Sequence, residues 1–346
     1  MKLPENPLAT DLEHILDHTR DLWDELRGEH IFITGGTGFF GSWLLESFAW
    51  ANDKLGLNAK AVVLTRNPGA FQIKAPHLAA HPAIQFHPGD NRSFEYPPGK
   101  FSHIIHAATE TNSKYANDPL ETFNANIGGT QRILGFTDRC EGRKFLFTSS
   151  GAVYGQQPPE MTHIQEDYPG APKTTELSTA YGQSKRTSEV LCTANAKKHG
   201  FQVTIARCFA FVGPLLPLDA NYAIGNFIRD GLNGGPILVQ GDGTPYRSYL
   251  YAADLAIWLW TILFKGQSGR PYNVGSEDDL SIAELGQVVA NELSPKASVT
   301  IVGKPAASQF ANRYVPSTKR AKMELGLESW IPIKEAIHRT VKFNIR

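Results

Sequence analysis

Short apolar runs recur along the first two thirds of the chain, and segments with helical or loop patterns separate them. These runs indicate strands over Ile31–Thr34, Ala61–Thr65, Ile84–His87, His103–Ala107, Lys144–Thr148 and Val203–Ala206. Near-continuous apolar strands that alternate with helices are typical of a parallel sheet covered on both faces. The pattern therefore predicts an α/β fold, a Rossmann-type doubly wound parallel sheet.

Different patterns precede and follow this alternation. Apolar positions at helical spacing predict an amphipathic helix over Leu8–Leu26, packed on the outside of the fold or on a partner. After Pro214 a loop is followed by a helix over Ile224–Leu232, a short strand over Ile237–Gln240 and a glycine-rich turn. We expect an N-terminal helical extension over residues 1–29 and a Rossmann dinucleotide-binding domain over 30–213. Residues 214–346 then form mainly a smaller C-terminal α/β substrate lobe, with some segments returning to the Rossmann sheet.

Composition narrows the classes of function. The chain has 34 basic and 34 acidic residues in 346, so it lacks the basic excess of a general nucleic-acid binder. Its three cysteines are far apart and form no C-x-x-C pair, which favours reduced, buried thiols. The N-terminus has no apolar signal region, and the longest apolar run, Leu255–Phe264, is about half of what spans a bilayer. We expect a soluble cytoplasmic protein without nucleic-acid or membrane partners.

Three glycines with the spacing G-x-x-G-x-x-G, Gly35, Gly38 and Gly41, follow the first predicted strand. Glycine allows a tight turn and lets backbone N–H groups at a helix N-terminus approach a pyrophosphate. Such triplets also arise by chance in loops, but here a strand precedes them and helical spacing follows from Ser42. The turn predicts a dinucleotide ligand.

Two further motifs carry hydroxyl and amine chemistry. Tyr181 and Lys185 stand as Y-x-x-x-K on one face of a predicted helix, where the ammonium would lower the phenol's pKa from its usual value of about 10. Ser150 follows a predicted strand, where its hydroxyl could bond a substrate oxygen. Each motif alone could be an ordinary surface or turn feature, but their order after the glycine turn indicates a redox site with Tyr181 as general acid or base.

At this point the chain resembles the extended short-chain dehydrogenase/reductases that act on nucleotide sugars, a family of NAD(P)-dependent epimerases, dehydratases and decarboxylases. The resemblance runs from about residue 30 to about residue 330. It rests on Gly35–Gly41, Gly89-Asp90, His106-Ala107-Ala108, Asn126 before Gly129-Thr130, Ser149-Ser150, Tyr181–Lys185, Gly213-Pro214, Gly241–Gly243 with Arg247, and Tyr272–Gly275.

The resemblance implies roles for individual residues. Tyr181 is the expected catalytic base, Lys185 holds the nicotinamide ribose and tunes Tyr181, and Ser150 orients the sugar oxygen. The expected cofactor-binding residues are Gly35, Thr37, Gly38, Phe39, Phe40, Gly41, Thr65, Arg66, Asp90, Asn91, Ala107, Ala108, Thr109, Asn126, Thr148, Tyr181 and Lys185. The expected substrate-binding residues are Ser150, Gly151, Ala152, Asn226 and Arg247, with Arg247 on the diphosphate. We expect no metal ion in the site, and we expect the protein to form a homodimer.

Departures from the family pattern refine the expected reaction. Family dehydratases have an Asp-Glu pair where this chain has Gly151-Ala152, and the similar decarboxylases keep the Glu. Eliminating water needs an acid and a base that neither residue supplies, so dehydration and decarboxylation are disfavoured. Ala210 replaces the family's usual Asn before the Gly213-Pro214 turn, which makes the sugar-nucleotide pose less certain than the cofactor pose.

The second predicted strand ends in Thr65-Arg66 rather than in an acidic residue. An acid there would bind the adenosine ribose 2′-OH of NAD, whereas Arg66 can accept the 2′-phosphate of NADP. The alternative is an ordinary solvent-facing arginine. We therefore expect NADP to be modestly favoured over NAD.

These residues predict an NAD(P)-dependent nucleotide-sugar enzyme of epimerase type, with hydride transfer at a sugar carbon that we expect to be C4. An NDP-4-keto-sugar reductase would use the same residues in one direction. A 4,6-dehydratase or decarboxylase is less favoured. A cofactor-binding regulator without turnover also stays open, although Ser150, Tyr181 and Lys185 argue against it.

Overall fold

The computed structural model of the protein describes residues 6–109, 118–220, 222–293, 297–304 and 311–345. The chain divides into two compact units, each built from three segments. The first unit consists of Met1–Val153, Lys173–Arg207 and Ala256–Tyr272. The second consists of Tyr154–Pro172, Cys208–Leu255 and Asn273–Arg346.

A seven-stranded sheet organises the first unit, in the order β11-β6-β5-β4-β1-β2-β3. Its strands are β1 (His30–Thr34), β2 (Lys60–Thr65), β3 (Ile84–Pro88), β4 (His103–His106), β5 (Lys144–Ser150), β6 (Gln202–Cys208) and β11 (Pro271–Val274). The first six lie within two residues of the predicted ranges, and the pairs from β3 to β5 are parallel. The predicted doubly wound α/β fold is confirmed.

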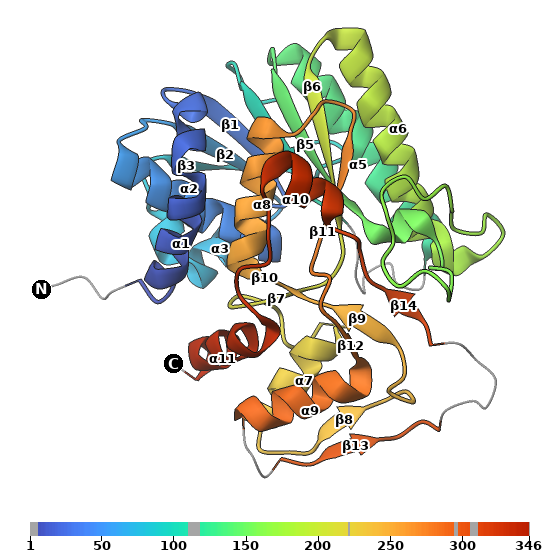
Figure 1. The fold of residues 1–346 in the computed structure, drawn as a ribbon. Coiled ribbons are helices and arrows are strands. Elements are labelled where there is room, and N and C mark those ends of the chain that lie inside the picture. Colours follow the sequence, from blue (N-terminus) through green and yellow to red (C-terminus); the bar gives the residue numbers. More distant parts are fainter. Residues whose placement is uncertain (1–5, 110–117, 221, 294–296, 305–310, 346) are drawn as a thin grey trace, which may run out of the picture. The chain divides into compact units, whose positions relative to one another are not determined.

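Helices cover both faces of this sheet. Figure 1 shows α5 and α6 on one side and α2 and α8 on the other. The helices of this region are α2 (Phe39–Leu55), α3 (Pro68–Lys74), α4 (Pro76–Ala79), α5 (Pro119–Arg139), α6 (Ala180–His199) and α8 (Ala252–Lys265). Phe32 of β1 is fully buried and packs at 4.7 Å from Phe136 of α5, ring centre to ring centre, within an aromatic core. Burial of these rings fixes the layers.

The N-terminal extension differs in detail from the single helix expected over Leu8–Leu26. It forms α1 (Ala9–Thr19) and then a tighter 3₁₀ helix over Arg20–Leu26. Thr19 lies at the junction, where its hydroxyl donates to the carbonyl of Ile15 and accepts from the indole N–H of Trp23. The tighter turns bury Trp23 completely, 4.7 Å from the Trp260 ring of α8. The extension is therefore packed on the outside of its own unit.

In the part of the chain that the structure describes, the second unit contains smaller sheets and several helices. β7 (Phe211–Val212) pairs with β10 (Leu250–Tyr251), and β8 (Ile237–Val239) pairs with β13 (Val299–Ile301). A three-stranded sheet has the order β12 (Asp279–Ser281), β9 (Tyr246–Ser248) and β14 (Arg313–Tyr314). The helices are α7 (Ala223–Leu232), α9 (Ile282–Leu293), α10 (Lys319–Leu325) and α11 (Ile333–Asn344). Within this unit α7 packs against α9.

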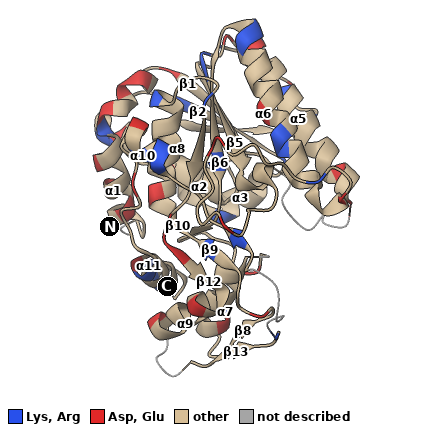
Figure 2. Ribbon diagram, turned by 45° about the vertical axis from the view of Figure 1, so that its right-hand side comes forward, with Lys and Arg blue, Asp and Glu red and all other residues tan. Residues whose placement is uncertain are grey.

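Charge and hydrophobicity are distributed as in a folded globular chain. Figure 2 shows basic and acidic residues interspersed over many elements rather than gathered on one. The apolar helix α8 is explained by burial, because Leu255, Trp258 and Leu259 are fully enclosed. Among the described residues, no helix has both the length and the apolar character needed to cross a bilayer.

Candidate active site

The glycine turn after β1 is crowded by backbone on two sides. Gly35 has a φ of +72°, and a Cβ there would lie 2.5 Å from the carbonyl carbon of Ala107. A Cβ on Gly41 would lie 2.2 Å from the Cα of Gly36. No side chain fits either space, so both positions require glycine for the turn itself.

Gly38, in contrast, faces open space. Its φ of −81° suits any residue, and a Cβ there would meet just the carbonyl oxygen of Gly35, at an ordinary 3.4 Å. Gly38 precedes α2, whose first turn has neither an acidic residue nor a side-chain cap. The first N–H groups of α2, from Phe39 to Gly41, therefore suit a pyrophosphate, so this turn fits the dinucleotide that the sequence predicts.

The adenosine end of the expected site lies at the ends of β2 and β3. Thr65 is buried and Arg66 is exposed. Oδ1 of Asp90 accepts hydrogen bonds from the backbone N–H of Arg92 at 2.9 Å and from its Nε at 3.0 Å. Burial raises the pKa of Asp90, but these hydrogen bonds and the charges of Arg92 and Arg66 outweigh it, so the pKa is lowered. Asp90 is therefore held as a carboxylate.

Asn91, also expected at the cofactor, lies against α5. A Cβ on Gly129 would come within 2.5 Å of its Nδ2. This contact packs the Asn91 side chain on the helix, and the absence of a side chain at Gly129 makes room for it.

Alanines and a hydrogen-bond chain form the region after β4. The N–H groups of Ala107 and Ala108 donate to the carbonyl and the hydroxyl of Thr34, which holds this backbone beside Gly35. A second chain starts at Thr109, whose hydroxyl donates to Oδ1 of Asn126 at 3.1 Å. Nδ2 of Asn126 donates to the hydroxyl of Ser184, and that hydroxyl lies 2.8 Å from the carbonyl of Tyr181. Asn126 therefore ties α5 to the start of α6.

His106 lies beneath these residues and was given no separate role by the sequence. Nδ1 of its ring lies 2.7 Å from the hydroxyl of Thr34, and Nε2 lies 3.3 Å from that of Thr130. Burial, together with the positive charge of Lys185, lowers its pKa to about 3. His106 is therefore neutral at physiological pH and acts as a hydrogen-bonding element of the core.

The catalytic residues predicted from sequence lie on α6 and at the end of β5. Lys185 is 2% exposed, and its Nζ donates to the carbonyl of Thr148 at 2.9 Å. The same Nζ lies 4.8 Å from the centre of the Phe147 ring and 5.9 Å from that of Tyr181. Ser150, two residues beyond Thr148 on β5, is buried and accepts a hydrogen bond from the N–H of Ala152. The structure thus brings the buried ammonium to Tyr181 and to the strand that carries Ser150.

A buried ion pair lies behind these residues and was missed from the sequence. Glu189 follows Tyr181 and Lys185 at spacings of eight and four residues, so all three share one face of α6. Its carboxylate accepts from the hydroxyl of Ser149 at 2.5 Å and from Nε and Nη2 of Arg207 at 3.0 and 2.7 Å. The pair connects α6 with β5 and β6. The helical spacing from Lys185 was the signal that could have indicated it.

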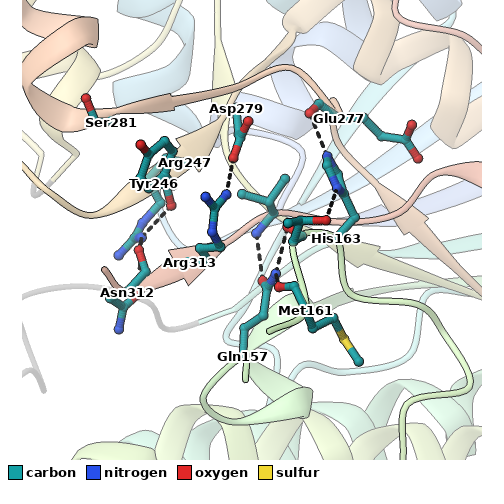
Figure 3. A network of polar contacts seen from close by, with 12 residues as sticks. Gln157, Met161, His163, Tyr246, Arg247, Glu277, Asp279, Ser281, Asn312 and Arg313 are labelled. Carbon is teal, nitrogen blue, oxygen red and sulfur yellow. Dashed lines mark hydrogen bonds and ion pairs between the residues drawn. The ribbon is translucent and has the colours of Figure 1, made fainter. Parts of the chain in front are cut away.

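Arg247, the residue expected to bind the substrate diphosphate, belongs to the second unit. Arg247 of β9 donates from Nη1 to the carbonyl of Tyr246 and to Oδ1 of Asn312 (Figure 3). Burial lowers its pKa, and among the described residues no carboxylate forms an ion pair with it. A half-buried guanidinium that pairs with no described carboxylate suits a phosphate.

Two further residues of the second unit, on β14 and α7, are relevant to the expected substrate site. Arg313, missed from the sequence, lies 4.1 Å above the ring of Tyr246 and pairs with Asp279. Asn226, also expected at the substrate, lies on α7 and accepts a hydrogen bond from Arg229.

Residues 31–275 match the model of the NAD dependent epimerase/dehydratase family. UDP-glucuronic acid decarboxylase 1 of Arabidopsis thaliana is 29% identical over 313 residues, which are 90% of this chain and 68% of that protein. The enzyme of the same name from Danio rerio is 28% identical, over 91% of this chain and 72% of the other.

Solved structures share the fold at lower identity. UDP-glucose 4-epimerase of Thermotoga maritima superposes with a TM-score of 0.76 and 18% identity, covering 91% of this chain and 98% of that one. The dTDP-glucose 4,6-dehydratase of Bacillus anthracis, solved with NAD, gives 0.75 and 20%, covering 92% and 96%. With the family model spanning most of its length, this chain belongs to the NAD dependent epimerase/dehydratase family, whose members are enzymes.

Proposed function

We propose that the protein oxidises and then re-reduces one carbon, C4, of a nucleoside-diphosphate sugar, and so interconverts two epimers. The observation that carries this proposal is the buried Lys185, whose Nζ lies on the backbone of Thr148 and 5.9 Å from the Tyr181 ring centre. A fixed ammonium near a phenol favours the phenolate, and a phenolate can take a proton from a sugar hydroxyl near neutral pH.

Each residue has a defined task in the proposed reaction. Ser150 bonds the reacting oxygen and orients it toward Tyr181. Tyr181 takes the hydroxyl proton while the carbon is oxidised, and it returns that proton when the carbon is reduced from the opposite face. The nicotinamide cofactor, when bound, accepts a hydride from the carbon and gives it back. Lys185 stabilises the Tyr181 phenolate before the first half-reaction and after the second, when Tyr181 does not hold the proton.

The residues after Ser150 support epimerisation over elimination. Gly151 and Ala152 begin a short 3₁₀ turn and have no titratable group. Loss of water from a neighbouring carbon needs an additional acid and base, whereas inversion at one carbon needs neither. Decarboxylation is the reaction named for the relatives that match by sequence. The panel of nucleotide sugars described below detects it through the release of CO₂.

A reductase is the second candidate, and Arg66 is the observation that favours it. An arginine after β2, in place of an acid, suits the 2′-phosphate of NADP, the cofactor that we propose to be modestly favoured. A reductase would use Tyr181 in one direction and release oxidised cofactor after each turnover.

We also propose that the protein is a homodimer. Leu120 on α5 and Val190 on α6 are 69% and 66% exposed, and a second copy would cover such apolar side chains. Light scattering after gel filtration gives the mass that tests this proposal.

The function is tested by a panel of nucleotide sugars that includes UDP-glucose and UDP-glucuronic acid, each with a small amount of cofactor. Products are identified by NMR, and reduced nicotinamide is followed by absorbance. Formation of the C4 epimer without net change of cofactor supports the proposal. Stoichiometric consumption of cofactor with a 4-keto sugar favours the reductase, and release of CO₂ from UDP-glucuronic acid favours a decarboxylase. Tyr181→Phe is the control and should be inactive in every arm.

A further inference from the structure

Lys74, the last residue of α3, reaches across to the glycine turn. Its Nζ lies 3.5 Å from the carbonyl oxygen of Thr37, between Gly35 and Gly38. A lysine in the last turn of a helix usually interacts with the carbonyls of that helix or with water. Here the side chain instead contacts a residue that lies 37 positions earlier in the chain.

The ammonium of Lys74 lies beside a carbonyl oxygen rather than beside a described carboxylate. Among the described residues its polar contact is the Thr37 carbonyl, and no carboxylate lies within ion-pair distance. Lys74 is exposed as a residue, and the protein atoms around its ammonium still lower its pKa by desolvation. Such an arrangement is improved by an anion placed beside it.

Arg66 provides a second positive charge in the same region. It follows β2 directly, and Asn67 then caps α3 by accepting from the N–H of Ala70. The charge of Arg66 contributes to the lowered pKa of Asp90, which places the guanidinium on the side where the adenosine is expected. Arg66 thus precedes α3 and Lys74 ends it, and Lys74 contacts the turn before α2, a helix without a carboxylate in its first turn.

We infer that Lys74 is the second cation, with Arg66, of a subsite for the 2′-phosphate of NADP(H). This inference rests on the proposed preference for NADP and deepens it. A phosphate monoester has a charge of about −1.5 to −2 at pH 7, more than one arginine neutralises. Lys74 contributes the remaining charge, and its approach to Thr37 places that charge between α3 and the dinucleotide turn.

The test compares two probes that differ by the 2′-phosphate alone, 2′,5′-ADP and 5′-AMP. Their dissociation constants are measured by calorimetry for the wild type, Lys74→Gln, Lys74→Arg and Arg66→Ala. We expect the wild type to prefer 2′,5′-ADP, and Lys74→Gln to reduce that preference about tenfold, the loss of one charge-assisted hydrogen bond. The affinity for 5′-AMP should not change, and Lys74→Arg should keep most of the preference.

Lys60→Gln is the matched control. Lys60 begins β2, about 16 Å from its other end by the rise of a strand, so its loss changes net charge without touching the subsite. Equal thermal unfolding of all variants shows that each is folded.

Two results overturn the inference, and they differ in what they say of the cofactor. If the wild type prefers 2′,5′-ADP and Arg66→Ala loses that preference while Lys74→Gln keeps it, NADP selection stands and the role of Lys74 is wrong. If the wild type binds both probes equally, the preference for NADP is wrong and the role of Lys74 falls with it.

Discussion

Glycine is present at the three positions of the first turn for different physical reasons. Gly35 and Gly41 are required by the protein's own backbone, because a Cβ at either would overlap Ala107 or Gly36. At Gly38 a Cβ would fit among the described residues, because it would meet the Gly35 carbonyl oxygen alone, at 3.4 Å. The space in front of Gly38 is therefore what a ligand would use.

A pair of alanine variants separates these reasons. Gly41→Ala should destabilise the protein by more than about 2 kcal/mol, because the new methyl group overlaps fixed backbone. Gly38→Ala should cost less than about 1 kcal/mol and should still weaken NADP binding at least tenfold by blocking the phosphate. Denaturant unfolding and cofactor titration measure both effects. Equal loss of stability in the two variants would contradict this assignment.

His106 predicts a dependence of stability on pH. Its pKa is about 3 in the folded protein and about 6.5 when unfolded, so between these values the unfolded chain binds the additional proton. Stability from this residue is therefore complete above pH 6.5 and falls by about 1.4 kcal/mol per unit as the pH drops toward 3.

The His106→Gln variant tests this dependence, because glutamine keeps hydrogen bonding but does not titrate. Unfolding free energies of both proteins are measured from pH 7.5 to about pH 4.5, a range that stays above most carboxyl pKa values. The wild type should lose stability faster than the variant as the pH falls. Parallel curves would show that His106 takes up a proton without unfolding.

Sequence patterns gave the chemistry of individual residues more readily than their partners. Tyr181 and Lys185 were found by their spacing, and the structure places the Lys185 ammonium near the Tyr181 ring. Glu189 and Lys74 were missed because their partners, Arg207 and Thr37, are distant in sequence and depend on how strands and helices pack. Spacing within one helix indicates which residues share a face, but it does not give what that face contacts.

At the scale of elements, α6 unites the chemistry of the site with a structural ion pair. One face of this helix carries Tyr181, Lys185 and Glu189, and it contacts β5 through the carbonyl of Thr148 and the hydroxyl of Ser149. Arg207 of β6 completes the pair with Glu189. The ion pair therefore sets the position of the helix that carries the proposed catalytic residues.

Breaking the pair from one side should be costly. Glu189→Gln leaves the Arg207 guanidinium buried without its anion, and we expect a loss of about 3 kcal/mol in the free energy of unfolding. Adding Arg207→Met should recover part of that loss, because the uncompensated charge is removed. A double-mutant cycle in denaturant measures the coupling. Additive losses would show that the two side chains act independently.

The N-terminal elements are tested by Trp23. This side chain is fully buried against Trp260 and Phe264 of α8, so its removal leaves a large cavity. Trp23→Ala should reduce the free energy of unfolding by about 3–5 kcal/mol. Trp50→Ala is the comparison, since that residue lies on α2 and is partly exposed. A smaller loss at Trp23 than at Trp50 would contradict the packing role of the extension.

Strands and helices could be predicted from the sequence where they were long enough to show a pattern of apolar residues. Six strands of the central sheet, each of four or more residues, were located to within two residues, because a sheet covered on both faces leaves a continuous apolar run. The seventh strand, β11, was not predicted. Strands β7, β9 and β10 have two or three residues each, which is too short for a pattern to register. The 3₁₀ helix over Arg20–Leu26 has the same apolar spacing as an α-helix and was not distinguished from one.

For the molecule as a whole, the family and the fold are established, and the proposed reaction follows from the side chains of the site. The family contains epimerases, dehydratases and decarboxylases, and the related proteins include both decarboxylases and epimerases. The buried Lys185 beside Tyr181 suits oxidation of a sugar carbon, and neither Gly151 nor Ala152 supplies an additional acid or base. We therefore propose that one carbon is oxidised and then reduced again with inversion within a single turnover.

Isotopic labelling tests this claim most directly. The nucleotide sugar that turns over in the panel is prepared with deuterium at C4, and the product is analysed by NMR. We predict that the deuterium is found on the inverted C4 and that none enters the solvent, because the same hydrogen leaves and returns. Release of deuterium to water would contradict the proposed oxidation and reduction at C4, and so would a product that keeps deuterium at a C4 of unchanged configuration.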